Sequence, residues 1–156
     1  MGLERTVILI KPDALQRGLV GEILHRFERK GLKLVAIKMT IMKDQVLNEW
    51  YLHHKDKSFF NDLKKYMKWT PIVAMVWEGL EAVSTVRKVV GATKGREAET
   101  GSIRGDFGMS VQQNLIHASE SVESAKREAE MMFGVDEIFE YESASECLIY
   151  SEEEKK

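Results

Sequence analysis

The sequence predicts a single α+β domain, in which a sheet of the split βαβ or ferredoxin-like type carries helices on its surface. Short β-branched apolar runs alternate along the chain with helix-length segments of amphipathic period. The 156 residues are enough for one domain with a sizeable core. Their 44% hydrophobic and 31% charged content excludes a disordered or fibrous chain. No repeat or linker divides the chain, so we expect one domain over residues 1–156.

The first half of the chain contains two predicted strands around one helix. The apolar run 6–10 has the length of a strand and stops at Lys11-Pro12, because proline supplies no backbone donor and restricts the residue before it. A helix follows and ends at Gly31, where a left-handed C-cap is expected. The next segment alternates between apolar and smaller or polar residues, which is the period of a half-buried strand. Its apolar positions are Val35, Ile37, Met39 and Ile41.

The second half adds further helices, two strands and one long loop. We expect Asp44 and Ser58 to cap two short helices. The apolar run 72–77 predicts a central strand, and the valine-rich helix after it ends at Gly91. Segment 91–110 holds several glycines and no apolar period, which predicts a loop of about twenty residues. A last strand around 115–116 precedes a helix capped by Ser121, and the acidic tail 151–156 is expected to be frayed. The inward face of that helix is predicted to hold Val122, Ala125, Ala129 and Met132.

Composition argues against several classes of partner and site. The formal net charge of −2 gives no bulk attraction to nucleic acid or to anionic membranes. No apolar stretch approaches the ~20 residues needed to span a bilayer, and residues 1–5 lack the hydrophobic run of a signal peptide. Cys147 is the only cysteine, so neither an internal disulfide nor a thiolate zinc site is supported. We therefore expect a cytoplasmic protein that requires neither nucleic acid nor a membrane.

Side chains, rather than a glycine-rich backbone, are expected to bind any phosphate. Neither G-x-x-x-x-G-K-[ST] nor G-x-G-x-x-G occurs in the chain. Taken singly, each candidate donor has an ordinary structural explanation, such as a basic residue that complements a helix dipole. A ferredoxin-like sheet can nevertheless bring them together into one anion site. The candidate donors are Lys11, Arg87, Thr93, Arg104 and Asn114.

His117 is the candidate nucleophile. It ends a short apolar run at the point where the chain turns polar. A lone histidine there is more often structural, but one held rigidly can accept a proton, a metal or a transferable group. Ser119 and Glu128 are candidate orienters of the imidazole. Glu128 lies seven positions after Ser121 on the same face of the predicted helix, so it can point back toward the strand end.

The other aromatic and histidine residues are weaker indications of a functional site. Phe59 or Phe60 could stack on a base beside a cationic pocket, and spacing does not choose between them. Tyr51 could reach a phosphate with its hydroxyl, although a tyrosine on an amphipathic helix is usually a core residue. His53 and His54 have no carboxylate at i+4 and the chain has no second metal-type cluster, so no metal site is predicted there.

Several stretches of the chain resemble one enzyme family. They are Lys11-Pro12-Asp13-Ala14, Arg17-Gly18, Gly21-Glu22-Ile23, Arg26 to Gly31, Gly101 to Gly108 and Asn114 to Ser121. Together they are similar to the motifs of nucleoside diphosphate kinase, and the resemblance runs from about Glu4 to about Tyr150. It implies a ferredoxin-like βαββαβ sandwich with a four-stranded antiparallel sheet. It also implies assembly of identical chains into a hexamer, or into a tetramer as in some bacteria.

The resemblance assigns a role to each candidate residue. His117 would take a phosphoryl group from a nucleoside triphosphate on Nδ1 and pass it to a nucleoside diphosphate, while Ser119 and Glu128 hold the ring. Mg²⁺ would bridge the nucleotide phosphates without a ligand from the protein. Phe59, rather than Phe60, matches the base-stacking position. The exchange would maintain nucleoside triphosphate pools with little discrimination between bases and sugars. The other positions that match nucleotide contacts of the family are Lys11, Tyr51, Leu63, Arg87, Thr93, Arg104, Val111 and Asn114.

The long loop departs from the family pattern. Thr93 is followed by Lys94-Gly95 where many members have Asn-Pro, and Glu99-Thr100 stand where a proline is common. We expect a more flexible loop, with consequences for assembly and thermal stability rather than for chemistry. Ala118 and Glu120 replace a glycine and an aspartate, which are conservative changes.

Two other classes of function would require different sequence features. A nucleotide-binding or regulatory module without turnover would show a changed nucleophile or lost phosphate donors, whereas here every matched position is intact. An RNA-binding sheet of similar topology would need exposed aromatic platforms and a basic face, and neither is visible in the net charge or in the strands. We therefore expect an active phosphotransferase.

Overall fold

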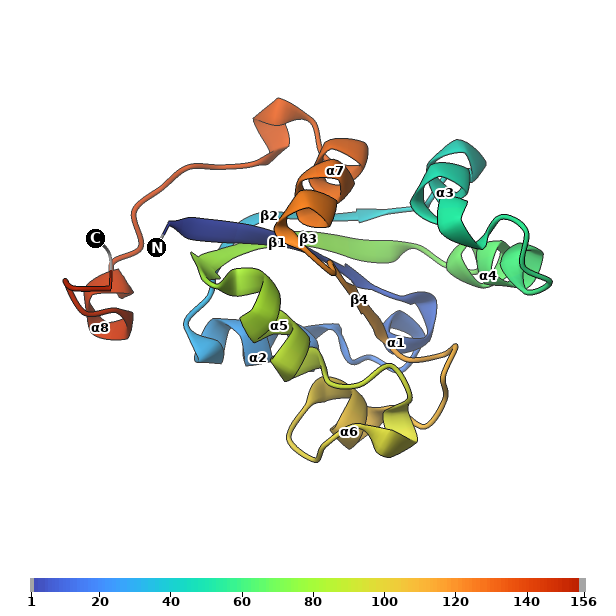
Figure 1. The fold of residues 1–156 in the computed structure, drawn as a ribbon, viewed down its shortest axis with the longest axis horizontal. Helices are drawn as coiled ribbons and strands as arrows, with labels where there is room; N and C mark the ends of the chain where they lie inside the picture. The colour runs from blue at the N-terminus through green and yellow to red at the C-terminus, as the bar shows by residue number, and fades with distance from the viewer. Residues whose placement is uncertain (1, 155–156) are drawn as a thin grey trace.

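The computed structural model describes residues 2–154 as an α+β sandwich built on one four-stranded sheet (Figure 1). The strand order is β2-β3-β1-β4, and every neighbouring pair is antiparallel. This order, with the first and third strands in the centre, is that of a ferredoxin-like sheet, so the predicted fold class is confirmed. The strands are β1 (Leu3–Ile10), β2 (Lys33–Thr40), β3 (Ile72–Leu80) and β4 (Ile116–Ala118).

The helices cover both faces of the sheet (Figure 1). On one face lie α1 (Pro12–Gln16), α2 (Val20–Lys30) and α5 (Ala82–Val90), with α6 (Ile103–Phe107) beyond α5. On the other lie α3 (Asp44–Trp50), α4 (Phe60–Met67) and α7 (Val122–Met132). A short α8 (Glu146–Ile149) follows, and single 3₁₀ turns occur at Leu52–His54, Gly95–Glu97 and Val135–Glu137. Among residues 2–154, no helix has the length and apolar character needed to cross a membrane.

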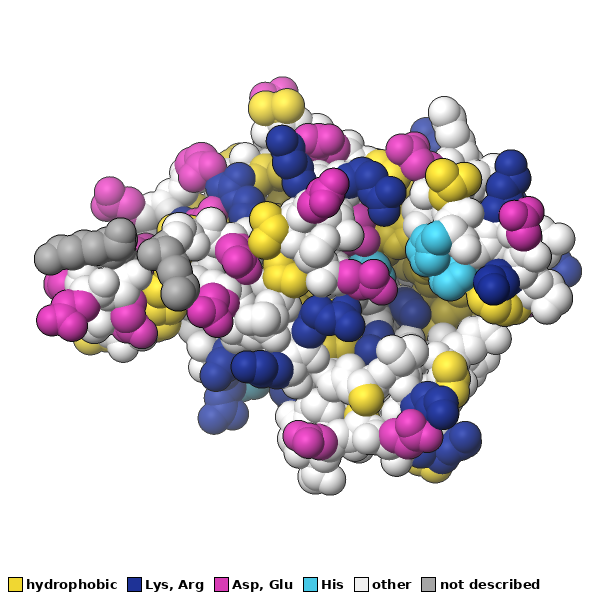
Figure 2. All heavy atoms as spheres, viewed as in Figure 1, with side chains coloured by type: hydrophobic (Ala, Val, Ile, Leu, Met, Phe, Trp, Pro, Cys, Tyr) yellow, Lys and Arg dark blue, Asp and Glu magenta, His cyan; other side chains and the backbone are white. Residues whose placement is uncertain are grey.

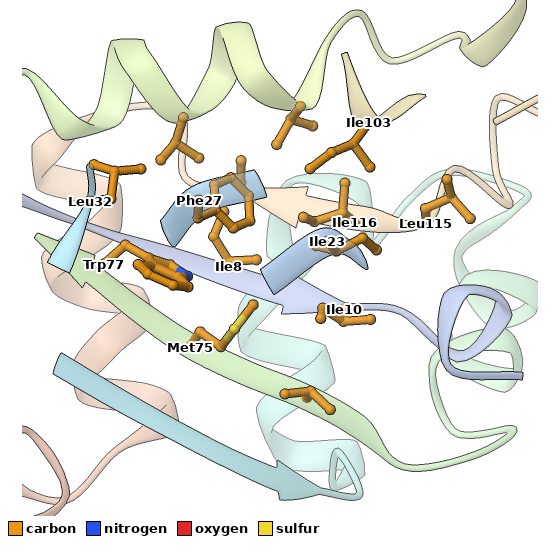
Figure 3. Packing of buried hydrophobic residues seen from close by; sticks show 14 of the residues in the cluster. Ile8, Ile10, Ile23, Phe27, Leu32, Met75, Trp77, Ile103, Leu115 and Ile116 are labelled. Atoms are coloured by element: carbon orange, nitrogen blue, oxygen red, sulfur yellow. The ribbon is translucent and has the colours of Figure 1, made fainter. Parts of the chain in front are cut away.

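The sheet separates two hydrophobic cores, and β1 contributes to both because its side chains alternate between faces. Ile8 and Ile10 enter the core under α2 and α5, where Phe27 and Trp77 pack with ring centroids 5.4 Å apart (Figure 3). Val7 and Leu9 enter the opposite core, under α3, α4 and α7. This central strand ends at Ile10, and so the fold fixes the position of Lys11, which follows it directly.

Three predicted helix caps are confirmed, including Gly91 at the C-terminus of α5, and two are wrong. Gly31 ends α2 in the left-handed conformation (φ 94°), and the Ser121 hydroxyl accepts a hydrogen bond from the Ser124 N–H at the start of α7. Asp44 and Ser58 do not cap helices, because the cap positions of α3 and α4 are one residue away and make no side-chain cap bond. The Asp44 carboxylate instead pairs with Lys68 Nζ at 2.7 Å.

Segment 91–110 is not the unstructured loop that its composition predicted. It contains α6, whose cap Ser102 accepts a hydrogen bond from the Gly105 N–H, and a 3₁₀ turn. Arg26 on α2 forms an ion pair with Asp106 at 2.7 Å, and this fixes α6 against the body of the fold. A Cβ built on Gly105 would lie 1.9 Å from the Glu99 carbonyl oxygen. Glycine here permits close backbone packing, which hydrophobic periodicity does not reveal.

Two predictions of inward-facing residues are also wrong. On β2, Ile37 and Met39 are 47% and 62% exposed, because β2 is an edge strand with a register shift between Leu34 and Ala36. Val122 is 51% exposed at the open first turn of α7. Farther along that helix, the buried residues are Ala125, Glu128 and Met132, so a charged side chain shares the inward face with the predicted apolar ones.

The C-terminal segment runs back along the body of the fold. The Phe139 N–H donates to the Val35 carbonyl at 2.9 Å, and the Tyr150 hydroxyl accepts from the Leu80 N–H at 3.2 Å. Of the tail that was expected to be frayed, residues 151–154 form a turn in which the Ser151 N–H donates to the Glu154 carboxylate at 2.9 Å. Residues 155–156 lie outside the described residues.

Candidate functional site

A cleft opens where β1 ends, between the start of β4 and the segment after α5. It collects all five predicted donors together with His117. Figure 2 shows lysine and arginine side chains gathered around this hollow, with histidine beside it. The cleft is lined by Lys11, Arg87, Val90, Gly91, Thr93, Arg104, Asn114, His117, Ala118 and Glu120.

The strand pairing explains why residues distant in sequence meet there. Because β4 pairs with β1, His117 lies opposite Leu9 and Ile116 lies opposite Ile10. Lys11 follows β1 directly and therefore lies beside the segment that leads into β4. Arg87 comes from the last turn of α5.

Lys11 is buried, and its charge is held beside other cations. Its Nζ donates to Asn114 Oδ1 at 2.7 Å, while Asn114 Nδ2 donates to the Thr93 carbonyl at 3.1 Å. Burial lowers the pKa of Lys11 from 10.5 to about 8; the charge of Arg104 also lowers it, and Asp13 opposes the shift. An anion bound in the cleft would stabilise this ammonium group.

Arg104 binds the backbone of the cleft rim. Its guanidinium donates to the carbonyls of Gly91 at 3.1 Å, Asn114 at 3.2 Å and Ile116 at 2.6 Å. Burial and the neighbouring Arg87 lower its pKa from 12.5 to about 10. The sequence suggested a phosphate donor at this position, and the structure shows that the side chain holds two segments of the rim together, the one at Gly91 and the one at Asn114 to Ile116.

The charges that line the cleft are predominantly positive. They are three cations, Lys11, Arg87 and Arg104, against one carboxylate, Glu120. The overall chain is slightly acidic, so this excess is local. A cluster of partly desolvated cations with hydrogen-bond donors is suited to a polyanionic group such as a chain of phosphates.

The His117 ring is held by a buried carboxylate. Its Nε2 lies 3.1 Å from Glu128 Oε1, and the Ser119 hydroxyl donates to Glu128 Oε2 at 2.5 Å. Ser119 in turn accepts from the Val7 N–H at 3.0 Å, which anchors the pair to β1. A carboxylate at Nε2 favours the tautomer with its proton there, leaving the lone pair on Nδ1. The ring can then act as a nucleophile without losing a proton first.

Sequence reasoning missed two residues at this site. Trp50 lies against the imidazole of His117 with ring centroids 5.2 Å apart and planes at 71°. It comes from α3, and no spacing in the chain connects it with β4. Glu120 lines the cleft from the polar turn after β4. Its closeness to His117 in sequence is a usable signal, but comparison with the family pattern marks it only as a conservative replacement of an aspartate.

The other predicted nucleotide contacts lie outside the cleft lining. Tyr51 is buried, and burial together with the charge of Glu128 raises the pKa of its hydroxyl. Phe59 precedes α4 and is 44% exposed, and Val111 is 47% exposed, whereas Leu63 is buried. The Phe60 ring is half-buried and covered by Lys64, so exposure favours Phe59 as a stacking platform.

Comparison with known proteins places this chain beside a single enzyme family. The family model described as nucleoside diphosphate kinase matches residues 4–138. A nucleoside diphosphate kinase of Parabacteroides distasonis is 45% identical over 97% of this chain and 99% of its own length. One from Archaeoglobus fulgidus is 49% identical over 96% of this chain and 99% of its own length.

Solved structures of nucleoside diphosphate kinases have the same fold as this chain. A halophilic nucleoside diphosphate kinase from Halobacterium salinarum, in complex with CDP, superimposes with a TM-score of 0.92 at 40% identity, covering 94% of this chain and 98% of that one. A family member from Babesia bovis gives a TM-score of 0.91 at 46% identity, with 94% and 99% covered. The chain therefore belongs to the nucleoside diphosphate kinase family, whose members are phosphotransferases.

Proposed function

We propose that this protein, acting as one domain, transfers the γ-phosphoryl group of a nucleoside triphosphate to a nucleoside diphosphate through a phosphohistidine at His117. One observation carries the proposal most directly. Glu128 holds Nε2 of an imidazole that lines a cleft of predominantly positive charge. That arrangement supplies a nucleophilic nitrogen and a binding site for phosphates in the same cleft.

The proposed reaction has two half-reactions of the same kind. Nδ1 of His117 attacks the γ-phosphorus, the bond to the bridging oxygen breaks, and the nucleoside diphosphate leaves with the bonding electrons. A second diphosphate then attacks the phosphohistidine with a terminal β-phosphate oxygen, which restores the imidazole. The negative charge of Glu128 stabilises the positive charge that the ring acquires while it carries the phosphoryl group.

The cations and donors of the cleft supply the rest of the catalysis. Phosphoryl transfer needs little covalent assistance, so positioning and charge stabilisation account for most of the rate. We assign Lys11 and Arg87 to the phosphate oxygens, and Asn114 and Thr93 to the phosphates and the ribose. We assign Arg104 both to the phosphates and to the rim that it binds.

We propose that the base is held by stacking. Exposed Phe59 and Val111, with Leu63 nearby, would hold its two faces. We assign the hydroxyl of Tyr51, at the C-cap of α3, to the phosphates and the ribose instead. Stacking is tolerant of base identity because every base has a π-face. A related structure was solved with CDP, which supports nucleotide binding in this family. We therefore propose broad tolerance of bases and sugars and a role in maintaining nucleoside triphosphate pools.

Mg²⁺ is proposed to accompany the nucleotide rather than to occupy a protein site. Over residues 2–154, no three His, Cys, Asp or Glu side chains gather as potential metal ligands. The cleft lining, with one carboxylate among three cations, does not fit a divalent cation but does fit phosphates. When bound, Mg²⁺ would neutralise part of the phosphate charge.

We also propose that the chain forms a homo-oligomer, with a hexamer favoured over a tetramer. The edge strand β2 supports self-association, since the apolar side chains of Ile37 and Met39 are exposed on it. Mass measurement in solution tests this, and a monomer at micromolar concentration would contradict it.

The function is tested by incubating the protein with [γ-³²P]ATP and analysing it under alkaline conditions that preserve phosphohistidine. The wild-type chain should take up acid-labile label and convert GDP to GTP, and His117→Ala should do neither. The proposal is wrong if the wild-type chain lacks both activities. The nucleophile is wrongly assigned if His117→Ala retains them.

A further inference from the structure

The residue that joins Asn114 to β4 has an unusual backbone conformation. Leu115 has φ 75°, in the left-handed region that bulky side chains rarely adopt. The Ile116 N–H donates to the Asn114 carbonyl at 2.9 Å across it. An i to i+2 hydrogen bond around a residue of this φ is a γ-turn, which is rare and strained. The turn lies between Asn114 and His117, so its shape sets the relative position of two site residues.

Both backbone groups of Leu115 are held by the segment that follows β1. Its carbonyl accepts from the Lys11 N–H at 2.9 Å, and its N–H donates to Asp13 Oδ2 at 3.1 Å. Its side chain is fully buried near Ile103 and Ile116, which opposes rotation of the turn (Figure 3). Strained conformations persist where the surroundings determine them in this way.

Asp13 connects this turn with α4. The residue is 7% exposed, and the second oxygen of its carboxylate, Oδ1, accepts a hydrogen bond from the Tyr66 hydroxyl. Tyr66 lies in α4, the helix that follows Phe59 and contains Leu63. Burial and the neighbouring carboxylate raise the pKa of the Tyr66 hydroxyl, which keeps it a donor. Each oxygen of the carboxylate therefore has its own partner, on a different element.

We propose that Asp13, held by Tyr66, is a positioning residue for the phosphoryl transfer. By fixing the γ-turn at Leu115, it sets the Asn114 carboxamide against Lys11 and places His117 at its distance from the phosphates. Asp13 does not line the cleft, so it acts through these residues and not on the nucleotide. The inference rests on the proposed transfer through His117.

A residue with only a structural role would affect the quantity of folded protein and not the rate of each folded site. The test is therefore the single-turnover rate constant for phosphorylation of the protein by saturating ATP, with the amplitude counting active sites, together with the melting temperature. The variants are Asp13→Ala, Asp13→Asn and Tyr66→Phe. The matched control is Tyr150→Phe, which removes a tyrosine hydroxyl bonded to the Leu80 N–H at the other end of the sheet.

We expect Asp13→Ala to lower the rate constant about 100-fold, as for a displacement of about 1 Å in the reacting groups. Asp13→Asn should recover most of that loss, because the amide can accept from Leu115 and donate to the tyrosine oxygen. Tyr66→Phe should lower the rate constant roughly threefold to tenfold, the effect of one hydrogen bond. Tyr150→Phe should leave it unchanged.

The inference is overturned if folded Asp13→Ala is phosphorylated at the wild-type rate. If Asp13→Ala does not fold, Tyr66→Phe decides the matter, because it keeps the carboxylate. A lower melting temperature with an unchanged rate constant would then refute positioning. Failure of the wild-type chain to be phosphorylated would instead refute the proposed function, so the two failures are distinguishable.

Discussion

Raising the pH above about 8 should lower the kcat/KM of this protein, because Lys11 loses the proton with which it binds phosphate. Burial beside Arg104 lowers the pKa of Lys11 to about 8 in the free protein. About one pH unit above that value, roughly a tenth of the molecules keep the ammonium group, so kcat/KM should fall about tenfold. Bound phosphates favour the charged form, so kcat should begin to fall at a higher pH than kcat/KM.

The same shift has the opposite effect on stability. The unfolded chain keeps the Lys11 proton up to about the ordinary lysine pKa of 10.5, whereas the folded chain releases it near 8. Between these values the unfolded state binds more protons, so the Lys11 contribution to the free energy of unfolding rises with pH. The full difference is on the order of 3 kcal/mol. Activity should therefore fall over a pH range in which the destabilising effect of the buried Lys11 charge is relieved and the protein becomes more stable.

The assay is the pH profile of kcat/KM and kcat for GDP phosphorylation, with the melting temperature measured at each pH. Lys11→Arg should move the alkaline limb to higher pH, because a guanidinium keeps its charge. The exposed Lys55→Gln is the matched control and should leave the profile unchanged. A flat kcat/KM up to about pH 9.5, or a limb that Lys11→Arg does not move, would refute the assignment.

Three further substitutions test other parts of the site and its support. Arg104→Ala should lower turnover, and also the free energy of unfolding by about 2 to 4 kcal/mol, since three rim carbonyls lose the hydrogen bond from the guanidinium. An unchanged chemical denaturation curve would contradict this. Glu128→Gln should lower kcat about 10- to 100-fold with a small change in melting temperature, because the negative charge beside His117 Nε2 is lost while the shape of the side chain is kept. A wild-type kcat in this variant would show that the charge of Glu128 does not contribute to catalysis. Gly105→Ala should destabilise by about 1 to 3 kcal/mol, because its Cβ would meet a carbonyl oxygen at 1.9 Å. The control, Gly21→Ala, has open space and should be neutral or stabilising in the same thermal unfolding experiment.

Hydrophobic periodicity was sufficient for the sheet and the longer helices, because burial of an apolar face determines where these elements lie. It failed where another interaction dominates. Glu128 occupies a buried helix position because it bonds to His117 and Ser119, and the segment containing Gly105 packs through backbone contacts that have no sequence period. Ile37 and Met39 follow the strand period, yet they lie exposed on an edge strand.

The candidate site could be predicted residue by residue but not contact by contact. Residue type and position selected Lys11, Arg104 and His117 as candidates, the resemblance gave them roles, and the structure brings them into one cleft. Arg104 also donates to three backbone carbonyls. These contacts depend on how segment 91–110 folds back on the body of the protein, which local sequence does not specify. The contact of Trp50 with the imidazole arises where α3 crosses the end of the sheet, and only the packed structure reveals it.

The most direct test of the central claim separates the two half-reactions. The protein is labelled with [γ-³²P]ATP, freed of nucleotide by gel filtration, and then mixed with unlabelled GDP alone. We predict that the label leaves the protein and appears in GTP, and that His117→Ala carries no label to transfer. Label that stays on the protein, or GTP that forms only when ATP and GDP are present together, would contradict a phosphohistidine carrier.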